Sequence, residues 1–410
     1  MSRSCDIIIA GGGMIGASLA CALDGLGLDV VVVEAGPVPG GGDAPAALDE
    51  RSTALAPVTR RILQTLGLWP ALAPAAEPIR RIHVSRRGGA GFTRLDAARE
   101  GVEALGYVIG NRALGEVLTH RLASCEAVEV INSARVSELS HSAAGVTVNL
   151  ETVDGHQRLD GCLLVAADGA ASRCRRLLGI GAERHDYGHS AIVTNLALPE
   201  PHEGLARERF TPDGPLALLP MTEGRMALVW TLRQPEVEHW LTCSDEAFVA
   251  QVNRCFGGRL GEVTAVGARQ AWPLSLVRAT QLTAPGGVVI GNAANTLHPV
   301  AGQGFNLGMR DMATLAEAIA TTPALGDSGW LDAYARGRRA DHRHLVGFSH
   351  GLVQLFGRRS PVPGFLLDAG LLGLDLCSPG KRGFARAAMG LTPPLPRLAR
   401  GLPLCTRRVS

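Results

Sequence analysis

A strand, a glycine-rich turn and a helix at the start of the chain constrain its fold more than any other feature. Residues 6–10 (Asp-Ile-Ile-Ile-Ala) form an apolar, β-branched run, which is typical of a parallel strand buried on both faces. Gly-Gly-Gly-Met-Ile-Gly follows at residues 11–16, residues 17–26 predict a helix, and residues 29–34 predict a second strand that ends in Glu34. This order of elements predicts a βαβ unit within an α/β protein.

Each glycine of this turn has its own mechanical role in a dinucleotide site. Gly11 permits the tight turn, Gly13 lets the backbone approach a pyrophosphate, and Gly16 lets helix and strand pack closely. The helix N-terminus offers free N–H groups and a partial positive charge to the phosphates. Glu34 would accept hydrogen bonds from both hydroxyls of an adenosine ribose. We therefore predict that this unit binds a dinucleotide.

Two later segments indicate which dinucleotide is bound. Within residues 163–175 another buried strand ends in Asp-Gly, and residues 287–295 form a strand that ends in a turn. Residues 298–311 (His-Pro-Val-Ala-Gly-Gln-Gly-Phe-Asn-Leu-Gly-Met-Arg-Asp) then lead into a helix predicted over residues 312–320. A plain nicotinamide domain has no need of a second glycine-rich strand–turn–helix about 280 residues after the first. A flavin does, because its ribityl chain and ring extend beyond the first unit, so we expect FAD.

Together these segments resemble the G-x-G-x-x-G, D-G and G-D fingerprints of flavoprotein aromatic hydroxylases. The chain is most similar to the UbiH/UbiF/VisC family of FAD-dependent ubiquinone-biosynthesis hydroxylases, and within it to the UbiH branch. The resemblance rests on residues 11–16, 51–69, 83–92, 208–230 (ERFTPDGPLALLPMTEGRMALVW) and 291–311. The wider superfamily usually has Asp and His where this chain has Asn292 and Asn295; the UbiH-like branch itself shows the Asn form.

The resemblance implies a p-hydroxybenzoate hydroxylase-like fold. In this fold a Rossmann-type FAD-binding domain is interleaved with a mixed β-sheet substrate domain. The predicted boundaries are 1–75, 100–180 and 276–340 for the FAD-binding domain, 76–99 and 181–275 for the substrate domain, and 341–410 for a C-terminal helical region. Apolar runs at residues 216–219 and 227–230, bounded by Pro and Gly, predict antiparallel strands in the substrate domain. The C-terminal region would pack on the flavin domain or form an interfacial surface for a lipid-tailed substrate.

The resemblance also implies a set of site residues. Arg51 would contact the flavin phosphate or ribityl region, Arg112 the pyrophosphate, and Asp168 would orient the Asp-Gly turn with support from Arg175. The backbone N–H groups of residues 302–306 would stabilise negative charge on a reduced flavin, and Asn292 would accept a ribityl hydroxyl through its carbonyl. The predicted cofactor-binding residues are Gly11, Gly13, Gly16, Glu34, Arg51, Arg112, Asp168, Asn292, Gly302, Gly304, Phe305 and Asn306. The predicted catalytic residues are His298, Pro299 and Gln303, beside the flavin ring.

Each of these residues also has an ordinary structural interpretation. Arg51 and Arg112 would then be solvated or ion-paired, and Asp168 would form a common Asp-Gly turn. The 302–306 segment would be a glycine-rich helix cap, and His298 a satisfied core histidine.

By the same resemblance, the chain is an FAD-dependent NAD(P)H:O2 monooxygenase of ubiquinone biosynthesis. It would hydroxylate 2-polyprenyl-6-methoxyphenol at ring C1 through a flavin C4a-hydroperoxide. NAD(P)H would bind transiently, because only one dinucleotide fingerprint is present. Four alternatives remain open: a sibling hydroxylase acting at another ring carbon, a prenyl-chain reductase, a non-catalytic flavin-binding subunit of the quinone-synthesis complex, and a plain NAD-dependent dehydrogenase.

Composition excludes several other classes. The 410 residues carry a net charge of +2, which gives no footprint for nucleic acid. Nine cysteines without C-x-x-C spacing argue against a zinc site and a disulfide framework, so no metal is expected. The uncharged stretches at residues 7–23 and 279–309 are interrupted by glycines or polar residues, so we predict no signal peptide and no membrane-spanning helix.

The expected location is cytoplasmic, with transient contact with the inner face of the cytoplasmic membrane as a further expectation. The expected partners are the prenylated phenol, O2 and a ubiquinone-biosynthesis complex.

Overall fold

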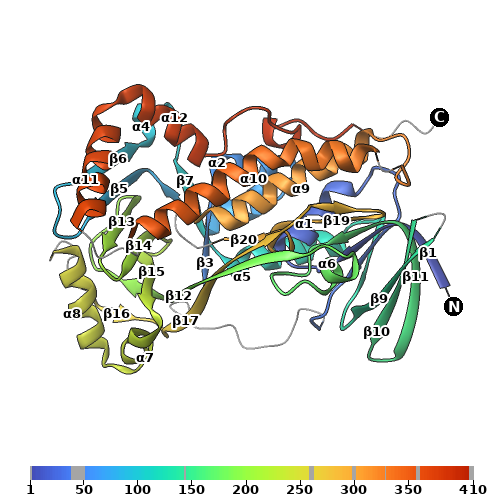
Figure 1. The fold of residues 1–410 in the computed structure, drawn as a ribbon, viewed down its shortest axis with the longest axis horizontal. Helices are drawn as coiled ribbons and strands as arrows, with labels where there is room; N and C mark the ends of the chain where they lie inside the picture. The colour runs from blue at the N-terminus through green and yellow to red at the C-terminus, as the bar shows by residue number, and fades with distance from the viewer. Residues whose placement is uncertain are drawn as a thin grey trace.

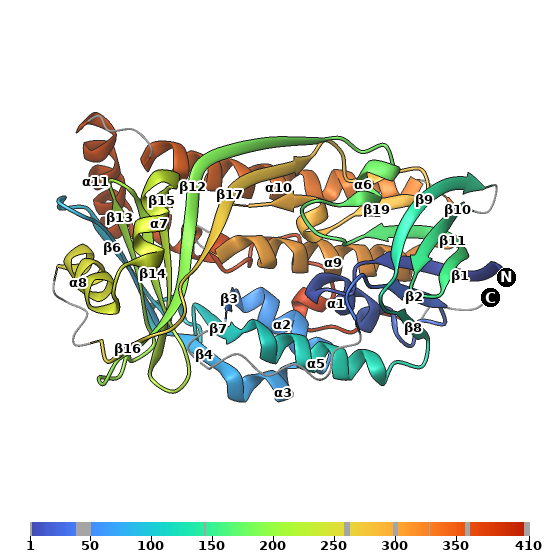
Figure 2. The same cartoon turned by 90° about the horizontal axis from the view of Figure 1, so that it is seen from below.

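The computed structural model describes residues 2–37, 51–142, 145–257, 263–297, 302–327, 329–356 and 361–405. The protein is elongated, with a β-sheet at each end and two long helices, α9 and α10, running between them (Figures 1 and 2). The segments predicted for the FAD-binding domain and for the substrate domain alternate along the chain, and their exact boundaries stay a prediction.

The first sheet carries the N-terminal βαβ unit. Its parallel part runs, in spatial order, β19 (Gly287–Val289), β11 (Gly155–Ala166), β1 (Ser2–Ala10), β2 (Val30–Val33) and β8 (Val128–Ile131). β18 (Thr283–Ala284), β10 (Gly145–Thr152) and β9 (Arg135–Ser142) extend it with antiparallel pairing. Ile7 and Ile9 are buried in one core and Ile8 in another, which confirms a strand buried on both faces. The carboxyl ends of β1, β2, β11 and β19 therefore meet at one edge, where doubly wound sheets bind ligands.

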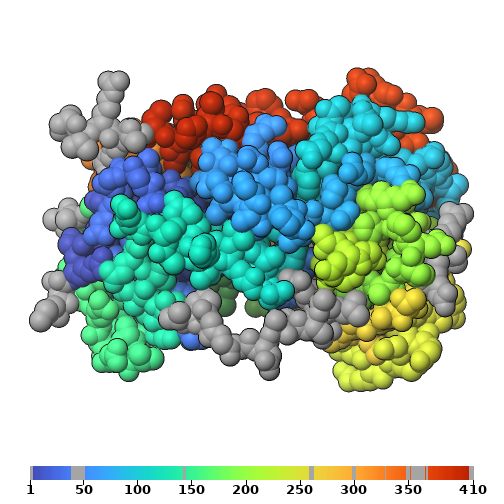
Figure 3. Space-filling view, turned by 180° about the vertical axis from the view of Figure 1, so that it is seen from behind, coloured from blue at the N-terminus to red at the C-terminus, as the bar shows by residue number. Residues whose placement is uncertain are grey.

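Helices and a small sheet cover this region. α1 (Met14–Leu23), α5 (Asn111–Ala123) and α6 (Arg173–Leu177) belong to the first half of the chain. The small sheet has the order β3 (Ser52–Leu55), β7 (Gly106–Gly110), β4 (Ala76–Ile79), and α2 (Pro57–Thr65), α3 (Trp69–Leu72) and η2 (Ala73–Ala75) lie between β3 and β4 in sequence. Figure 3 shows these segments in blue and teal over the middle of the opposite face of the molecule.

The second sheet lies at the other end and is mostly antiparallel. Its order is β20 (Asn295–Thr296), β17 (Gln270–Ala279), β12 (Ala182–Ala197), β15 (Arg225–Arg233), β14 (Gly214–Pro220), β13 (Leu205–Thr211), β5 (Arg81–Arg86), β6 (Phe92–Asp96), with β16 (Ala265–Val266) beside β12. α4 (Ala97–Glu100) follows β6, and α7 (Gln234–Thr242) and α8 (Asp245–Phe256) lie against one sheet face. The predicted strands at residues 216–219 and 227–230 lie in β14 and β15 and are confirmed. β12 and β17 form a long ribbon that reaches from this sheet to the first one (Figure 2).

The remaining helices are η3 (Gly291–Ala293), α9 (Gln303–Thr321), α10 (Gly329–Phe356), α11 (Pro361–Leu376), α12 (Ser378–Ala388) and η5 (Leu398–Arg400). α9 begins at Gln303, nine residues before the predicted start at Met312, because the glycine-rich segment is already helical and packed. The predicted start of the C-terminal region at residue 341 falls inside α10.

A buried ionic cluster joins α9 to α10. Asp311 accepts hydrogen bonds from Arg338 Nε (2.6 Å) and His342 Nε2 (2.7 Å), and Asp341 accepts from Arg310 Nε (2.8 Å). Burial alone would raise the pKa of Asp311, but His342 and Arg338 outweigh it and hold that pKa below its usual value. The cluster fixes how α9, whose N-terminus faces the site, sits against α10.

Candidate active site

The glycine turn after β1 has the geometry that its spacing predicts. Gly11 has φ +103°, and a Cβ there would lie 2.6 Å from the Ala167 carbonyl oxygen. A Cβ on Gly16 would lie 1.9 Å from the Gly11 carbonyl oxygen, so only glycine fits between helix and strand. A Cβ on Gly13 would meet no atom within 4 Å. The described residues therefore leave no room for a side chain at Gly11 or Gly16, whereas the space beside Gly13 is open.

Glu34 lies at the carboxyl end of β2 beside this turn. Its carboxylate accepts hydrogen bonds from the backbone N–H groups of Gly12 (2.6 Å) and Gly36 (2.7 Å). Each carboxylate oxygen keeps a further lone pair, so the group can still accept from a ligand hydroxyl. The two backbone bonds fix the side chain next to the glycine turn.

Asp168 and Arg175 organise the loop that follows β11. The Asp168 carboxylate accepts hydrogen bonds from the Ser172 hydroxyl and from the Cys174 backbone N–H, the latter at 3.0 Å. Arg175 donates to the carbonyl oxygens of Ala170 (3.3 Å) and Ala293 (2.7 Å). Burial lowers the pKa of the Arg175 guanidinium. Arg175 thus ties the Asp-Gly loop to the second glycine turn at η3.

The second glycine turn packs directly on α1. Gly291 has φ +60°, and a Cβ on Gly308 of α9 would lie 3.1 Å from the Gly291 Cα and 3.0 Å from Ile15 Cδ1. These glycines allow α9, η3 and the start of α1 to touch. The backbone oxygen of Asn292 accepts from the Thr296 hydroxyl at 3.2 Å, while the Asn292 side chain is exposed.

Asn306 locks the first turn of α9 onto β3 and α2. Its Nδ2 donates to the carbonyl oxygens of Ala54 (2.9 Å) and Gly302 (2.8 Å). Its Oδ1 accepts from the Ala56 N–H and the Thr59 hydroxyl, both at 2.7 Å. The buried amide is fully used by the protein, so Asn306 shapes the helix start rather than offering its side chain to a ligand.

The N-terminus of α9 holds the other predicted residues of this loop. Gly302 caps the helix with φ +58°, and half-buried Phe305 packs against the main core. Gln303 Nε2 donates to the Ala388 carbonyl oxygen at 3.2 Å, but its buried Oε1 has no hydrogen-bond partner in the described part of the chain. Among the described residues, the atom nearest to a Cβ built on Gly304 is Leu297 Cβ, at 4.0 Å. His298 and Pro299 lie outside the described residues.

The two predicted arginine side chains are both exposed. Arg51 is exposed, with its guanidinium 4.7 Å from the centre of the Trp272 ring on β17, and its carbonyl oxygen accepts from the Asn111 N–H at 2.8 Å. Arg112, in the first turn of α5, is exposed and paired with Glu116 at 2.9 Å. The protein buries neither arginine side chain against the two glycine-rich turns.

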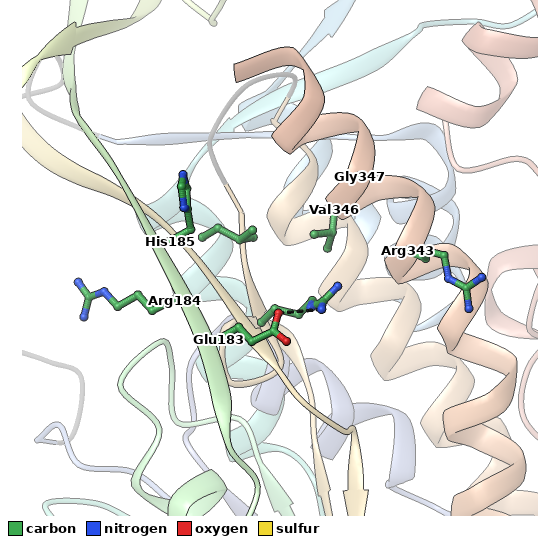
Figure 4. A pocket seen from close by; sticks show the side chains of 8 residues that line it. Glu183, Arg184, His185, Arg343, Val346 and Gly347 are labelled. Atoms are coloured by element: carbon green, nitrogen blue, oxygen red, sulfur yellow. Dashed lines mark hydrogen bonds and ion pairs between the residues drawn. The ribbon is translucent and has the colours of Figure 1, made fainter. Parts of the chain in front are cut away.

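A separate hollow of about 470 Å³ lies between the β12–β17 ribbon and α10 (Figure 4). Its walls include His185 and Leu276 from the ribbon and Val346 from α10. Glu183 and Arg278, on the two strands, pair with each other at 2.7 Å. Arg184 and Arg343 also line the hollow, so its rim carries positive charge beside apolar surface from Leu276 and Val346.

Sequence reasoning missed two features of this part of the structure. Trp272 is 44% exposed and lies under Arg51, and its only sequence signal was a bulky aromatic side chain within a strand. The ionic cluster of Asp311, Arg338 and His342 had no local signal, because its partners lie on two helices.

Among the described residues there is no group of three or more His, Cys, Asp or Glu that could hold a metal ion. No helix in the described ranges is long and apolar enough to cross a bilayer.

Comparison with known proteins agrees with this geometry. Residues 4–349 match the family described as "FAD binding domain". The chain is 38% identical to ubiquinone hydroxylase UbiL of Rhodospirillum rubrum, over 97% of this chain and 93% of the relative. It is 30% identical to 3-demethoxyubiquinol 3-hydroxylase of Escherichia coli, over 94% of this chain and 98% of the relative.

Solved structures show the same fold at low sequence identity. p-Nitrophenol 4-monooxygenase PnpA of Pseudomonas putida superposes with a TM-score of 0.76 at 19% identity, covering 95% of this chain and 98% of that one. HpxO of Klebsiella pneumoniae, solved with FAD, gives a TM-score of 0.73 at 19% identity over 95% and 99% of the two chains. The glycine cradle, the family match and the relatives agree: the chain belongs to the FAD-binding-domain family and, within it, to the ubiquinone hydroxylases, which are FAD-dependent monooxygenases.

Proposed function

We propose that the protein hydroxylates the aromatic ring of a polyprenylated phenol in ubiquinone biosynthesis, with 2-polyprenyl-6-methoxyphenol as substrate and ring C1 as the position. The observation that carries the general proposal is the full-length similarity to two ubiquinone-pathway hydroxylases, combined with the flavin cradle. The specific ring position rests on the resemblance of segments such as residues 208–230 to the UbiH branch.

The residues present fit FAD. Gly13 leaves open space where a pyrophosphate would approach, and the N–H groups at the start of α1 face that space. Glu34 would hold the adenosine ribose, and Asp168 and Asn292 would lie along the ribityl chain. The buried Oε1 of Gln303 is a polar atom for which the described residues supply no partner.

The chemistry divides between cofactor and protein. FAD, when bound, takes two electrons from NAD(P)H and supplies the oxygen atom from O2 that is transferred to the ring. The protein orients the phenol, excludes water and places the positive end of α9 where negative charge develops on the ring system. Arg51 and Arg112 would assist at the phosphate side, and His298, Pro299 and Gln303 would line the ring side.

A second candidate function is the same hydroxylation at a different ring carbon. The 30% identity to a 3-demethoxyubiquinol 3-hydroxylase favours attack at a different ring position, and the name of the 38% relative specifies no carbon. A non-catalytic flavin-binding subunit is the third possibility and predicts flavin binding without turnover.

One experiment separates these candidates. Purified holoprotein is incubated aerobically with NADH or NADPH and, in turn, with short-chain analogues of 2-polyprenyl-6-methoxyphenol and demethoxyubiquinol. The proposal predicts conversion of the first phenol to a product heavier by one oxygen atom, with the new hydroxyl at C1. Conversion of demethoxyubiquinol alone would favour the second candidate, and yellow protein without any product would favour the subunit.

Contact with a membrane surface and with a ubiquinone-biosynthesis complex are further parts of the proposal. α11 exposes Phe365 (72%) and Leu376 (83%), and α12 carries exposed Arg382 and Arg386. Flotation of the full chain with vesicles containing anionic phospholipid tests the membrane contact. A double variant, Phe365→Ser with Leu376→Ser, should float less than the parent, and equal flotation would count against it.

A further inference from the structure

Glu208 lies in a row of side chains that crosses the middle of the second sheet. The strand register aligns Glu208 on β13 with Val84 on β5 and Ala217 on β14. Ala217 pairs with Val229 on β15, and Val229 pairs with Val193 on β12. Paired residues project from the same sheet face, so these five side chains form one line, here termed the central row.

The two faces of this sheet are covered unequally. On the opposite face Leu216, Leu218 and Trp230 are buried beneath α7 and α8. The five members of the central row are each only half-buried, although they lie in the interior strands of a nine-stranded sheet. On the central-row face Val84 packs against Phe210 and Leu371 of α11, and the five side chains of the row keep accessible surface.

The central-row face is connected to the start of α9 through the end of α12. Ala206 and Ala227, on the same face as the central row, pack in a buried cluster with Ala385 and Met389 at the end of α12. The neighbouring Ala388 carbonyl oxygen accepts the hydrogen bond from Gln303 Nε2 at the start of α9. The end of α12 thus touches both the central-row face and the N-terminus of α9, which brings these two surfaces close to each other.

The Glu208 carboxylate has no hydrogen-bond or ion-pair partner among the described residues, and its neighbours in the central row are apolar. Two charged side chains on the elements around it are paired with other residues: Arg86 of β5 with Asp368 of α11 at 2.5 Å, and Lys381 of α12 with Asp375 at 3.1 Å. Burial alone raises the pKa of Glu208 to about 7. A largely buried carboxyl group without a hydrogen-bond partner costs folding free energy, and a bound ligand that donates a hydrogen bond to it would offset that cost.

We propose that Glu208 is a catalytic residue that accepts the proton of the substrate's phenolic hydroxyl. This inference rests on the proposed function, because it assumes a phenol in the site. The proton moves from the phenol oxygen to a Glu208 oxygen as the ring attacks the oxygen atom derived from O2. NAD(P)H supplies the two electrons, the second oxygen atom leaves as water, the attacked ring carbon loses its hydrogen as H⁺, and Glu208 returns a proton to the phenol oxygen.

Turnover of Glu208→Gln tests the role. The variant keeps the shape of the side chain but cannot accept the proton, so kcat should fall about 100-fold with KM changed less than about threefold. The acidic limb of the wild-type kcat/KM profile, near pH 7, should disappear in the variant. Glu208→Asp should recover part of kcat. Glu238→Gln, an exposed substitution on α7 behind the sheet, is the matched control and should behave as wild type. Unchanged kcat and an unchanged pH profile in Glu208→Gln would overturn the proposal.

A binding measurement separates this proposal from the proposed function, because it needs no turnover. The probe is 4-nitrophenol, whose absorbance reports its ionisation, titrated with holoprotein in the absence of NAD(P)H. Wild type should raise the apparent pKa of the bound probe relative to Glu208→Gln, because the Glu208 carboxylate accepts a hydrogen bond from the neutral phenol and repels the phenolate, whereas neutral glutamine does not repel it. Identical probe titrations would overturn the role of Glu208 even if ring hydroxylation is found, and a difference would support it even if the natural substrate is another phenol.

Discussion

The guanidinium of Arg175 donates a hydrogen bond of 2.7 Å to the carbonyl oxygen of Ala293, a residue 118 positions later in the chain. Arg175 lies in α6, directly after the loop that follows β11, and Ala293 lies in η3, in the turn that follows β19; β11 and β19 are adjacent parallel strands. One buried side chain therefore sets the spacing between two of the three segments that form the flavin cradle.

Removal of this link should weaken FAD binding. In Arg175→Met the hydrogen bonds to Ala170 and Ala293 are lost and a buried carbonyl loses its donor, which costs about 1–3 kcal/mol. FAD affinity should fall about tenfold to a hundredfold, as measured by flavin fluorescence during titration of the apoprotein. Arg176→Met is the control, because Arg176 bonds only to Ala171 and Ser172 within its own loop. Equal affinities for the two variants would contradict the role of Arg175.

Two glycines of the first turn should respond differently to alanine. Gly16→Ala places a Cβ against the Gly11 carbonyl oxygen, so the apoprotein should lose about 2 kcal/mol or more of unfolding free energy. Gly13→Ala meets no protein atom, so its apoprotein should melt within about 1 °C of wild type while FAD binding weakens. Calorimetry of both apoproteins and FAD titration check this. A destabilised Gly13→Ala apoprotein would show that the open space at Gly13 is not reserved for a ligand.

The ionic cluster between α9 and α10 should govern stability in acid. Because the pKa of Asp311 is lowered in the folded protein, its contribution is present above the usual carboxyl pKa and is lost as pH falls through the folded pKa. Asp311→Asn leaves Arg338 and His342 without their anion, so it should cost about 3–5 kcal/mol at pH 7 and less near pH 3. Denaturant unfolding at the two pH values measures the difference. Glu116→Gln, which breaks the exposed pair with Arg112, should change stability by less than about 0.5 kcal/mol.

Glu208 should destabilise the folded protein in alkali. Its pKa rises from the usual 4.5 to about 7 on folding, so it favours the folded state fully below the usual value, and that contribution is lost as pH rises through 7. The stability of Glu208→Gln relative to wild type should therefore increase by about 2 kcal/mol between pH 5 and pH 8. Thermal unfolding at both pH values gives this difference, and a difference that does not depend on pH would show that the carboxyl is well solvated.

Patterns within short stretches predicted the parts of the fold that depend on neighbouring residues. The β-branched run at residues 6–10 and the glycine spacing at residues 11–16 determine strand and turn through local sterics, and both agree with the structure. The start of α9 was predicted too late, because glycines at 304 and 308 disfavour helix locally. Packing on Ile15 and the four hydrogen bonds of Asn306 outweigh that preference.

Features that depend on which distant strands and helices lie side by side could not be predicted from the sequence. Glu208 stands between Arg207 and Arg209 in the sequence, and its isolation among apolar side chains follows only from which residues of β5 and β14 lie beside it. The partners of Asp311 lie 27 and 31 residues away on another helix, so no spacing rule indicates them. The roles of Arg51 and Arg112 stay predictions, since both side chains are exposed without a ligand.

The hydrogen bonds from Gln303 to Ala388 and from Val58 to Met389 have a consequence for biosynthesis of the enzyme. A ribosome releases the nucleotide-binding turn at residues 11–16 long before residues 388 and 389. The nascent polypeptide therefore exposes this turn well before the two hydrogen bonds that hold the starts of α9 and α2 can form, and truncations that remove residues 388 and 389 should yield protein that retains FAD poorly.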